Sequence, residues 1–514
     1  MAIYVFNLLV GYFPCGVDNA QGYRAKILDR IGDTVRYIFT EIPSVQDIEY
    51  YRGLGIPVGE MLSAHQYFTD NCSLDATVEI DAKLRELKKS LQYTDVRNTN
   101  VGMELLKNRE IIASVLFDRA RKECIRGIMY FKQAKLIRSE FYTGGLLYAE
   151  YFVTATSNGR QYAKLVRRTY FSRDGIACFD MIYDNGEERY LLPDGRYYKK
   201  SEFMAEFIKR LKLTEKDTVI IDRFSQWEYV QPLFQFGNKA RFIAVFHTGH
   251  YFEENEGPAH LLYLNEEYYY PFRNAKFIDT IVVSTEEQKK ELQEKLTEYG
   301  QRVPEIAVIP AGGIQGLRYP ETVRKPYSLI AVSRLARSRR IQEIIRSVVL
   351  AHERNPEISL DIYGSGEYEQ ELCKIVEENS AQRYIRFAGY QNVTEIYKNY
   401  EVLLTASFHE TFGLAMLEAI SSGLAMIGWD AKYGNHLFIH PGKNGYLIAL
   451  DLKSVEGEDQ RVKDMAEKIV EIFRDRKRLD EFSQYSYRLA GKFLFREVEE
   501  KWKRLLADEK KHSS

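Results

Sequence analysis

The sequence predicts an α/β protein with two Rossmann-like lobes and an antiparallel β-meander inserted into the N-terminal lobe. Short apolar runs alternate with helical stretches in both halves of the chain, which is typical of parallel, doubly wound sheets. A block of turn dipeptides between β-rich runs interrupts the first half. The length of 514 residues exceeds what one hydrophobic core usually holds, so we expect two or three domains.

The N-terminal lobe opens with an apolar run at residues 3–13. No basic region precedes this run, no cleavage pattern follows it, and it is too short to span a bilayer. It therefore predicts a buried strand. Three further strands of the same lobe are expected at residues 218–222, 242–246 and 280–284.

The insertion is expected at residues 61–200. Its first part is rich in Lys, Arg, Leu and Glu and predicts helix. Its second part carries four dipeptides that supply the positive φ of tight hairpins, Asn158-Gly159, Asp174-Gly175, Asn185-Gly186 and Asp194-Gly195. The segment is either a stabilising decoration or a surface that binds an acceptor or a partner.

Five apolar runs predict the parallel sheet of the C-terminal lobe, at residues 328–333, 359–363, 384–388, 402–406 and 424–428. The predicted division of the chain is 1–60 and 201–315 for the N-terminal lobe, 61–200 for the insertion, 316–495 for the C-terminal lobe, and 496–514 for a terminal helix and tail.

Composition excludes several classes of protein. Lys plus Arg number 72 against 73 for Asp plus Glu, so no net charge favours nucleic acid as the main partner. The five cysteines are scattered without C-x-x-C pairing, which argues against a disulfide framework and fits a reducing cytoplasm. No long uninterrupted apolar run is present and the mean hydropathy is −0.37, so we expect any association with the cytoplasmic membrane face to be peripheral or through a partner.

The strongest chemical signal is a pair of carboxylates, Glu410 and Glu418, separated by seven residues in a strand, loop and helix pattern. Gly413 indicates a close backbone approach, and Gly423 is placed to end the helix at its C′ position. The amides of residues 411–414 are expected to face the carboxyl edge of the sheet and bind an anion. One acid could then hold a sugar and the other a ribose. Alternatively, Glu418 is a solvated helix residue and Glu410 favours the helix dipole.

A basic segment follows the first strand of the C-terminal lobe. Ser333 and Arg334 end the strand, and Arg339 and Arg340 begin the next helix. Guanidinium groups at this position suit bidentate binding of phosphate oxygens. The alternative is a surface cluster that pairs with acids such as Glu343.

Two glycine positions suggest contact with a nucleotide. Gly364 and Gly366 follow a strand, but the third glycine of a dinucleotide fingerprint is replaced by Glu369, so a dehydrogenase is a remote alternative. A loop against which a nucleotide base packs would be enough to account for Gly364 and Gly366. Gly16 precedes a helix of the N-terminal lobe and could admit a diphosphate or an acceptor.

His247 and His250 follow an expected strand at its carboxyl end. Each could simply be a hydrogen-bonded structural histidine. Partners for a metal ion are not visible, and no D-x-D motif stands beside a suitable strand, so we expect no metal site, no cofactor and a metal-free mechanism.

These motifs together resemble the retaining glycosyltransferases of family four, which have the two-lobed GT-B fold. The resemblance rests on Ser333-Arg334-Leu335-Ala336, Arg339, Gly364-Ser365-Gly366, the Glu410 and Glu418 pair, and residues 444–448. Residues 16–26, 38–40 and 67–70 narrow it to the GtfA-like O-glycosyltransferases of the accessory Sec system. That resemblance implies transfer of GlcNAc or glucose from a UDP-sugar to Ser/Thr hydroxyls of a serine-rich repeat adhesin. It also implies a GtfB-like stabilising subunit as partner.

The same resemblance implies roles for individual residues. Arg334 and Arg339 would bind the donor diphosphate, with Arg339 standing where the family commonly has Lys. Glu410 and His247 would contact the hexose, and Glu418 the ribose. The catalytic set is thus Arg334, Arg339, Glu410 and His247, and the UDP-sugar-binding set is Gly16, Ser333, Gly364, Thr411, Phe412, Gly413, Leu414 and Glu418.

Two alternatives share this fold. A wall teichoic acid α-glycosyltransferase would use a polyol-phosphate acceptor, and the excess of basic side chains in the meander keeps that alternative open. A non-catalytic partner subunit would not need Arg334, Glu410 and Glu418, so their presence argues against it.

Overall fold

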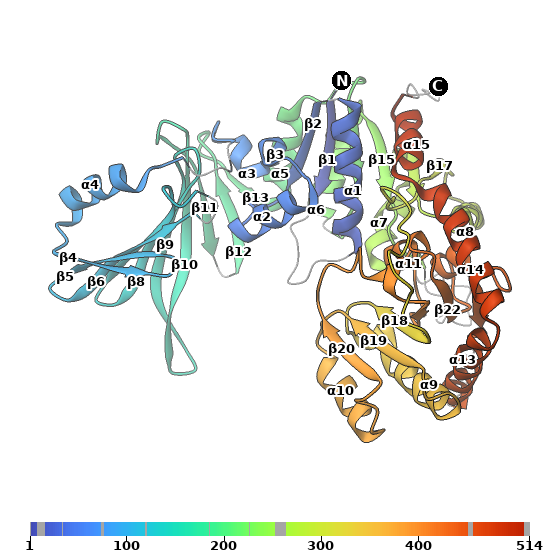
Figure 1. Cartoon of the computed structure of the whole chain (residues 1–514). Coiled ribbons are helices and arrows are strands. Elements are labelled where there is room, and N and C mark those ends of the chain that lie inside the picture. The colour runs from blue at the N-terminus through green and yellow to red at the C-terminus, as the bar shows by residue number, and fades with distance from the viewer. Residues whose placement is uncertain are drawn as a thin grey trace. The chain divides into compact units, whose positions relative to one another are not determined.

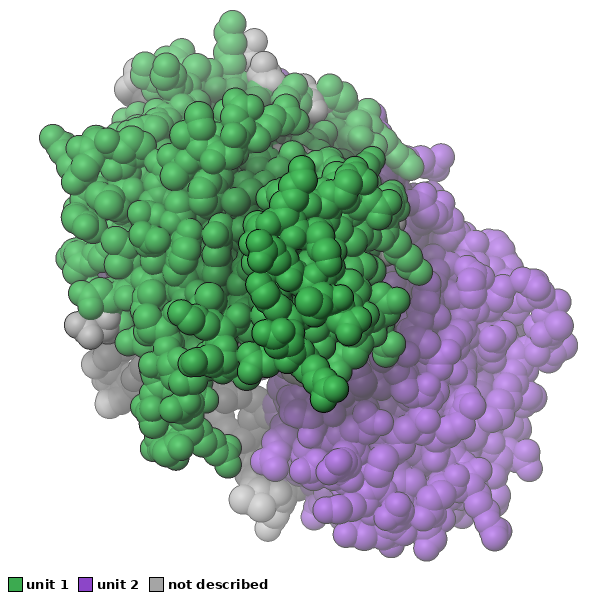
Figure 2. Space-filling view, turned by 90° about the vertical axis from the view of Figure 1, so that its left-hand side faces the viewer, with its two compact units in different colours: residues 1–18, 28–243 green, residues 19–27, 244–514 purple. Residues whose placement is uncertain are grey.

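The computed structural model describes residues 2–7, 16–32, 34–72, 74, 77–118, 121–184, 186–225, 227–251, 264–450 and 456–507 (Figure 1). The chain forms two compact units (Figure 2). Unit 1 comprises residues 1–18 and 28–243, and unit 2 comprises residues 19–27 and 244–514. The predicted five-part division of the chain remains a prediction.

Unit 1 contains a parallel sheet in which β14 (Thr218–Ile221), β1 (Ala2–Asn7), β2 (Thr34–Phe39) and β3 (Met61–Ser63) lie in that order. The strand predicted from residue 3 is confirmed up to Asn7, and residues 8–13 lie outside the described residues. Its side chains Ile3, Val5 and Phe6 are fully buried, because an apolar strand between two neighbours belongs in the core.

Helices connect the strands of unit 1. They are α2 (Val45–Leu54), α3 (Ala64–Tyr67), α4 (Ile80–Leu91), α5 (Lys200–Leu211) and α6 (Trp227–Phe236). A further helix, α1 (Gly16–Ile31), contributes residues to both units, and the last boundary between the units along the chain falls within β15 (Arg241–Val245).

The predicted meander is a ten-stranded antiparallel sheet in unit 1 (Figure 1). Its strands pair in chain order, and they are β4 (Asp95–Thr99), β5 (Gly102–Lys107), β6 (Glu110–Phe117), β7 (Ile125–Lys132), β8 (Lys135–Tyr142), β9 (Leu146–Ser157), β10 (Arg160–Phe171), β11 (Ala177–Asp184), β12 (Glu187–Leu191) and β13 (Tyr197–Lys199). The four predicted turn glycines all have positive φ, between 74° and 87°. Asn185 lies outside the described residues.

The prediction of helix for the first part of the insertion is wrong from Asp95 onward, where five strands form. Helix is confined to short segments such as α4. Two of the missed hairpins turn on Asn108-Arg109 and Gln133-Ala134, whose φ values of 51° to 69° are left-handed although none of the four is glycine. Because the usual Asn-Gly signal is absent, these turns could not be recognised from the sequence.

Unit 2 contains a parallel six-stranded sheet in the order β20-β19-β18-β21-β22-β23. Its strands are β18 (Ser328–Val332), β19 (Ser359–Tyr363), β20 (Ile385–Gly389), β21 (Val402–Thr405), β22 (Ala425–Trp429) and β23 (Gly445–Ile448). The five predicted strands are confirmed to within one residue at each end. Residues 445–448 were recognised only as part of a motif and not as a strand.

The helices of this sheet enclose two buried apolar clusters. They are α9 (Ile341–Arg354), α10 (Glu369–Glu378), α11 (Leu414–Ser421), α12 (Gly434–Phe438), α13 (Glu456–Arg474) and α14 (Arg476–Ala490). The helix α15 (Phe495–Ala507) follows them in the chain. Unit 2 also holds α7 (Glu266–Arg273), α8 (Glu286–Glu298) and the parallel pair β16 (Thr280–Val283) and β17 (Glu305–Val308). No helix within the described residues is long and apolar enough to cross a membrane.

Candidate active site

The candidate site lies where the strand order of the six-stranded sheet reverses. The chain passes from β18 to β19 on one side, and β21 then pairs with the other side of β18. Ligands of open α/β sheets bind at the carboxyl end of such a switch point. Ser333 and Arg334 follow β18 there, and Glu410 follows β21.

An ion pair joins the two loops across this point. Arg339, in the 3-10 turn before α9, places Nη1 at 2.8 Å from Oε2 of Glu410 and at 3.1 Å from Oγ of Ser407. The side chains of Arg339 and Glu410 are 35% and 23% exposed, so both remain accessible to a ligand. The structure therefore brings together two residues of the predicted catalytic set.

Arg334 is exposed, and its side chain has no hydrogen-bonding or charged partner among the described residues. Arg340 pairs with Glu343, as the alternative predicted, but Glu343 is fully buried, so the pair is not a surface cluster. Arg339 pairs with Glu410 instead. Arg334 is thus available to an anionic ligand, on the loop that leads from β18 to Arg339.

Gly364 and Gly366 permit two loops to pack against each other. A Cβ atom at Gly364 would lie 1.9 Å from the Ser333 carbonyl oxygen, and one at Gly366 would lie 2.3 Å from that of Leu335. Backbone bonds join the same loops, since Ser333 donates to Tyr363 at 3.1 Å and Leu335 donates to Ser365 at 2.9 Å. The glycines therefore fix the backbone that carries Arg334.

The helix after Glu410 begins later than predicted. Residues 411–413 form the loop, Gly413 with φ 84° is the N-cap, and α11 starts at Leu414. The first intrahelical bond runs from Leu417 N to Gly413 O at 3.0 Å, so the amides of residues 414–416 have no acceptor within the helix. These amides, rather than those of Thr411 to Gly413, form the positive helix end. Gly423 with φ 70° ends the helix as predicted.

Phe412 cannot contact a ligand through its ring. Its side chain is buried in the core, with ring centroids 5.2 Å from Phe438 and 6.2 Å from Phe493. Only the backbone of Phe412 is left for the predicted binding of the UDP-sugar. Thr411 and Leu414 are partly exposed.

Glu418 lies one turn into α11 and is not a solvated surface acid. Burial raises the pKa of its carboxyl group, while Arg318 and the Tyr397 hydroxyl lower it. Burial and the Glu418 carboxylate raise the pKa of Tyr397 well above its ordinary value. Glu418 is thus a largely buried acid with a cationic and a hydroxyl neighbour.

The two histidines after β15 differ in their surroundings. His247 is partly exposed, and its backbone amide donates to the Tyr268 hydroxyl at 2.7 Å. His250 is fully buried, and burial lowers its pKa to about 3. Neither ring nitrogen of His250 has a hydrogen-bond partner within the described residues.

Helix α8 contacts two loops, the one that carries His247 and His250 and the one that carries Tyr433 and Gly434. Gln288 Nε2 donates to the Thr248 carbonyl at 3.0 Å, and Glu291 accepts from the Tyr433 hydroxyl at 2.6 Å. Gly434 N in turn donates to the Glu410 carbonyl at 2.6 Å. No motif in the sequence points to Gln288, Glu291 or Tyr433, because these residues meet only in the folded chain.

Gly16 is the first residue of α1 and belongs to unit 1, whereas the other predicted site residues belong to unit 2. Within the described part of the chain, no group of three or more His, Cys, Asp and Glu side chains is arranged to hold a metal ion.

Two family models match the chain. The model described as "Glycosyl transferases group 1" matches residues 320–489, and the model described as "GtfA extended beta-sheet domain" matches residues 95–194. The first match covers the candidate site, and the second covers most of the antiparallel sheet.

Related proteins match over the full length. The UDP-N-acetylglucosamine–peptide N-acetylglucosaminyltransferase GtfA subunit of Streptococcus gordonii is 35% identical over 99% of both chains. A crystal structure of the pneumococcal O-GlcNAc transferase GtfA in complex with UDP and GlcNAc is 32% identical, with a TM-score of 0.86 over 98% of both chains. A GtfA/B complex structure is 34% identical, with a TM-score of 0.88 over 98% of this chain and 99% of that one. The expected GT-B fold is confirmed, and the chain belongs to the GtfA-subunit family of glycosyltransferases.

Proposed function

We propose that this chain transfers GlcNAc from UDP-GlcNAc to Ser/Thr hydroxyls of a serine-rich repeat adhesin, as the first step of its O-glycosylation. The observation that carries the proposal is the Arg339 and Glu410 pair at the switch point, beside Arg334 and the free amides of α11. Cationic groups for a diphosphate and a carboxylate for a hexose then meet in one place. The names of the full-length relatives support GlcNAc and a peptide acceptor.

The proposed mechanism retains the configuration of the anomeric carbon. The acceptor hydroxyl attacks this carbon from the face that UDP leaves, so the bond to the phosphate oxygen breaks as the new glycosidic bond forms. The hydroxyl proton passes to the departing diphosphate. Arg334, Arg339 and the α11 amides stabilise the negative charge that develops there, and no protein nucleophile or metal ion is required.

Other groups position the donor. Glu418 accepts the ribose hydroxyls, while Glu410 and His247 contact the hexose. UDP-glucose remains the alternative donor, because a single acetamide contact separates the two sugars.

The antiparallel sheet is proposed to bind the acceptor or a GtfB-like stabilising subunit. Its match to the GtfA extended β-sheet domain and the existence of a GtfA/B complex among the relatives support this assignment. The proposed location is the cytoplasm, with peripheral contact at the membrane.

The direct test measures label transfer from UDP-GlcNAc and, in parallel, from UDP-glucose. Each donor is offered a Ser/Thr-rich polypeptide and a polyol-phosphate polymer, with and without EDTA. Labelled polypeptide from UDP-GlcNAc, unaffected by EDTA, is the expected result. Label on the polymer alone would make the protein a teichoic acid transferase, and loss of transfer in EDTA would exclude the metal-free mechanism.

A further inference from the structure

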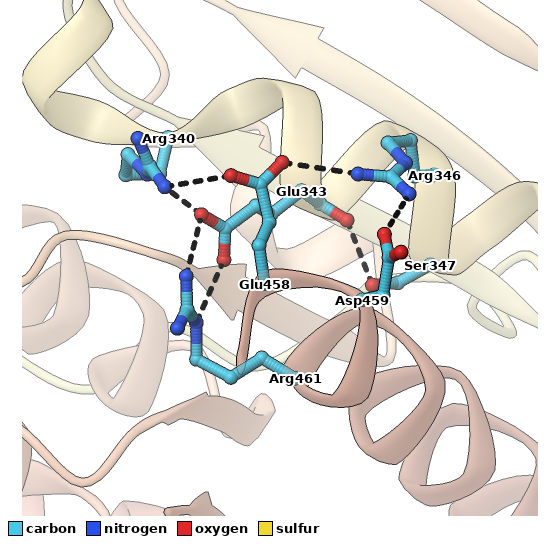
Figure 3. Close-up of polar contacts among 7 residues, drawn as sticks. All are labelled: Arg340, Glu343, Arg346, Ser347, Glu458, Asp459 and Arg461. Atoms are coloured by element: carbon cyan, nitrogen blue, oxygen red, sulfur yellow. Dashed lines mark hydrogen bonds and ion pairs between the residues drawn. The ribbon is translucent and has the colours of Figure 1, made fainter. Parts of the chain in front are cut away.

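A buried carboxylate lies behind the Arg339 and Glu410 pair. The side chain of Glu343 on α9 has no exposed surface. It accepts from Arg340 Nε at 2.6 Å and from Arg461 Nε on α13 at 3.2 Å, and Figure 3 shows the carboxylate between these two guanidinium groups. Removing a carboxylate from water is costly unless it is paired, so Glu343 keeps both arginines in place.

The guanidinium groups of Arg340 and Arg461 both contact the ring of Phe408. The guanidinium carbon of Arg340 lies 4.8 Å from the centroid of Phe408, and that of Arg461 lies 5.2 Å from it. Each contact is within the range of a favourable cation–π interaction. Phe408 is therefore held by two charges that share a single buried counterion.

The position of Phe408 in the chain connects this cluster to the candidate site. Phe408 follows Ser407 and lies two residues before Glu410, and Ser407 and Glu410 are the two side chains that contact Arg339. Arg340 is the residue after Arg339. Glu343 thus anchors the turn that carries the guanidinium and the loop that carries its carboxylate partner.

A second layer of ion pairs surrounds Glu343. Glu458 on α13 accepts from Arg340 at 2.9 Å and from Arg346 at 3.0 Å, and Asp459 also pairs with Arg346 (Figure 3). The side chains of Arg346 and Asp459 are 39% and 63% exposed. Exposed pairs contribute little stability, so the buried Glu343 is the member on which the arrangement depends.

We propose that Glu343, Arg461 and Phe408 are positioning residues that set the geometry of the Arg339 and Glu410 pair. This inference rests on the proposed transferase function. Glu343 holds the guanidinium groups of Arg340 and Arg461, and these hold the ring of Phe408. The ring in turn sets the distance between the Arg339 guanidinium, proposed for the diphosphate, and the Glu410 carboxylate, proposed for the hexose.

The test compares Glu343→Gln, Phe408→Leu and Phe408→Tyr with Glu401→Gln as a matched control. Glu401 is also a buried acid paired with an arginine, accepting from Arg476 Nη1 at 3.0 Å, but it precedes β21 at the opposite end of that strand from Ser407. For each variant we would measure kcat, the KM of the donor, the melting temperature and a crystal structure. Both glutamine variants are expected to lose stability.

Only variants of the cluster are expected to lose turnover. Glu343→Gln and Phe408→Leu should lower kcat by about tenfold or more, since small misplacements of reacting groups are costly, and should change the donor KM by less than about threefold. Phe408→Tyr, which keeps the ring, should retain turnover. In the crystal structure of Glu343→Gln, Arg339 should no longer contact Glu410.

Three results would overturn the inference. They are turnover of Glu343→Gln and Phe408→Leu within twofold of the unmodified chain, an equal loss in Glu401→Gln, and an intact Arg339 and Glu410 pair in the Glu343→Gln structure. If the unmodified chain transfers no sugar, the proposed function fails. The crystal structure would still decide whether Glu343 positions the pair.

Discussion

The Arg339 guanidinium lies 2.8 Å from the Glu410 carboxylate, so the groups proposed for the diphosphate and the hexose contact each other. This pairing orients both side chains before a donor enters. In the proposed complex, a phosphate oxygen and Glu410 would share the Arg339 guanidinium. Arg334 has no side-chain partner among the described residues, so it could bind a phosphate without breaking an existing ion pair.

Arg334→Gln should lower kcat by about 100-fold, because it removes a charge that stabilises the departing UDP. Arg334 is exposed, so the melting temperature should change little. Arg337→Gln is the control, since Arg337 is also exposed but its guanidinium lies over the Tyr368 ring. Full turnover by Arg334→Gln in steady-state kinetics would remove Arg334 from the site.

Glu410→Gln should separate binding of UDP from transfer of the sugar. Loss of the carboxylate charge frees Arg339 for phosphate, so UDP should bind as tightly as before or more tightly. Transfer should fall by about 100-fold, because the hexose loses a charged contact. Calorimetric titration with UDP and a label-transfer assay give the two quantities. Weaker binding of UDP would show that Glu410 supports the nucleotide itself.

Gly434→Ala should disturb the loop that carries Glu410. A Cβ atom at Gly434 would lie 2.5 Å from the Phe412 carbonyl oxygen and 2.7 Å from that of Glu410, and both are backbone atoms with little freedom to move. We expect a loss of turnover of at least about tenfold. Gly316→Ala, where a Cβ atom meets nothing within 4 Å, should leave kcat unchanged. Similar kinetics for the two variants would contradict the proposed packing.

His65 should make unit 1 sensitive to acid. Its ring lies among aromatic rings, with centroids 5.3 Å from both Tyr170 and Phe203, and burial lowers its pKa to about 4. In the unfolded chain the His65 imidazole binds a proton near pH 6.5, whereas in the folded chain it does so only near pH 4. The stability that neutral His65 contributes is therefore complete above about pH 6.5 and is lost as the pH falls toward 4. The shift corresponds to about 3 kcal/mol.

Chemical denaturation of His65→Phe between pH 7 and 4 tests this expectation. The variant should lose less stability than the unmodified chain over that range, whereas replacement of the exposed His409 by Phe should not alter the slope. An unchanged slope in His65→Phe would assign the acid sensitivity to other groups.

Most of the parallel strands could be predicted because they are short apolar runs with buried side chains on both faces. β2, with exposed Thr34 and Arg36 among its residues, was not predicted as a strand. The meander could be predicted only where glycine occupies the left-handed turn positions, as at Gly159 and Gly175. The turns at Asn108 and Gln133 adopt the same backbone without glycine, and their strands were missed. Strands and turns could therefore be predicted where an apolar run or a turn glycine marks them in the sequence, and were missed where neither does.

The candidate site divides in the same way. Arg339 and Glu410 could be named from motifs at strand ends, and the structure places them in contact. Their pairing with each other was not predicted, and neither was the role of Glu343 beyond a surface partner. Such relationships depend on which helices pack together, which no short segment of the sequence records.

The side chains of Gln288 and Glu291 leave one helix three residues apart and reach the Thr248 carbonyl and the Tyr433 hydroxyl. A small displacement of α8 along its axis would carry both loops with it and leave their separation unchanged. Shortening Glu291 to Asp would remove one methylene from the contact with the Tyr433 hydroxyl, so it would release one loop while Gln288 still holds the other.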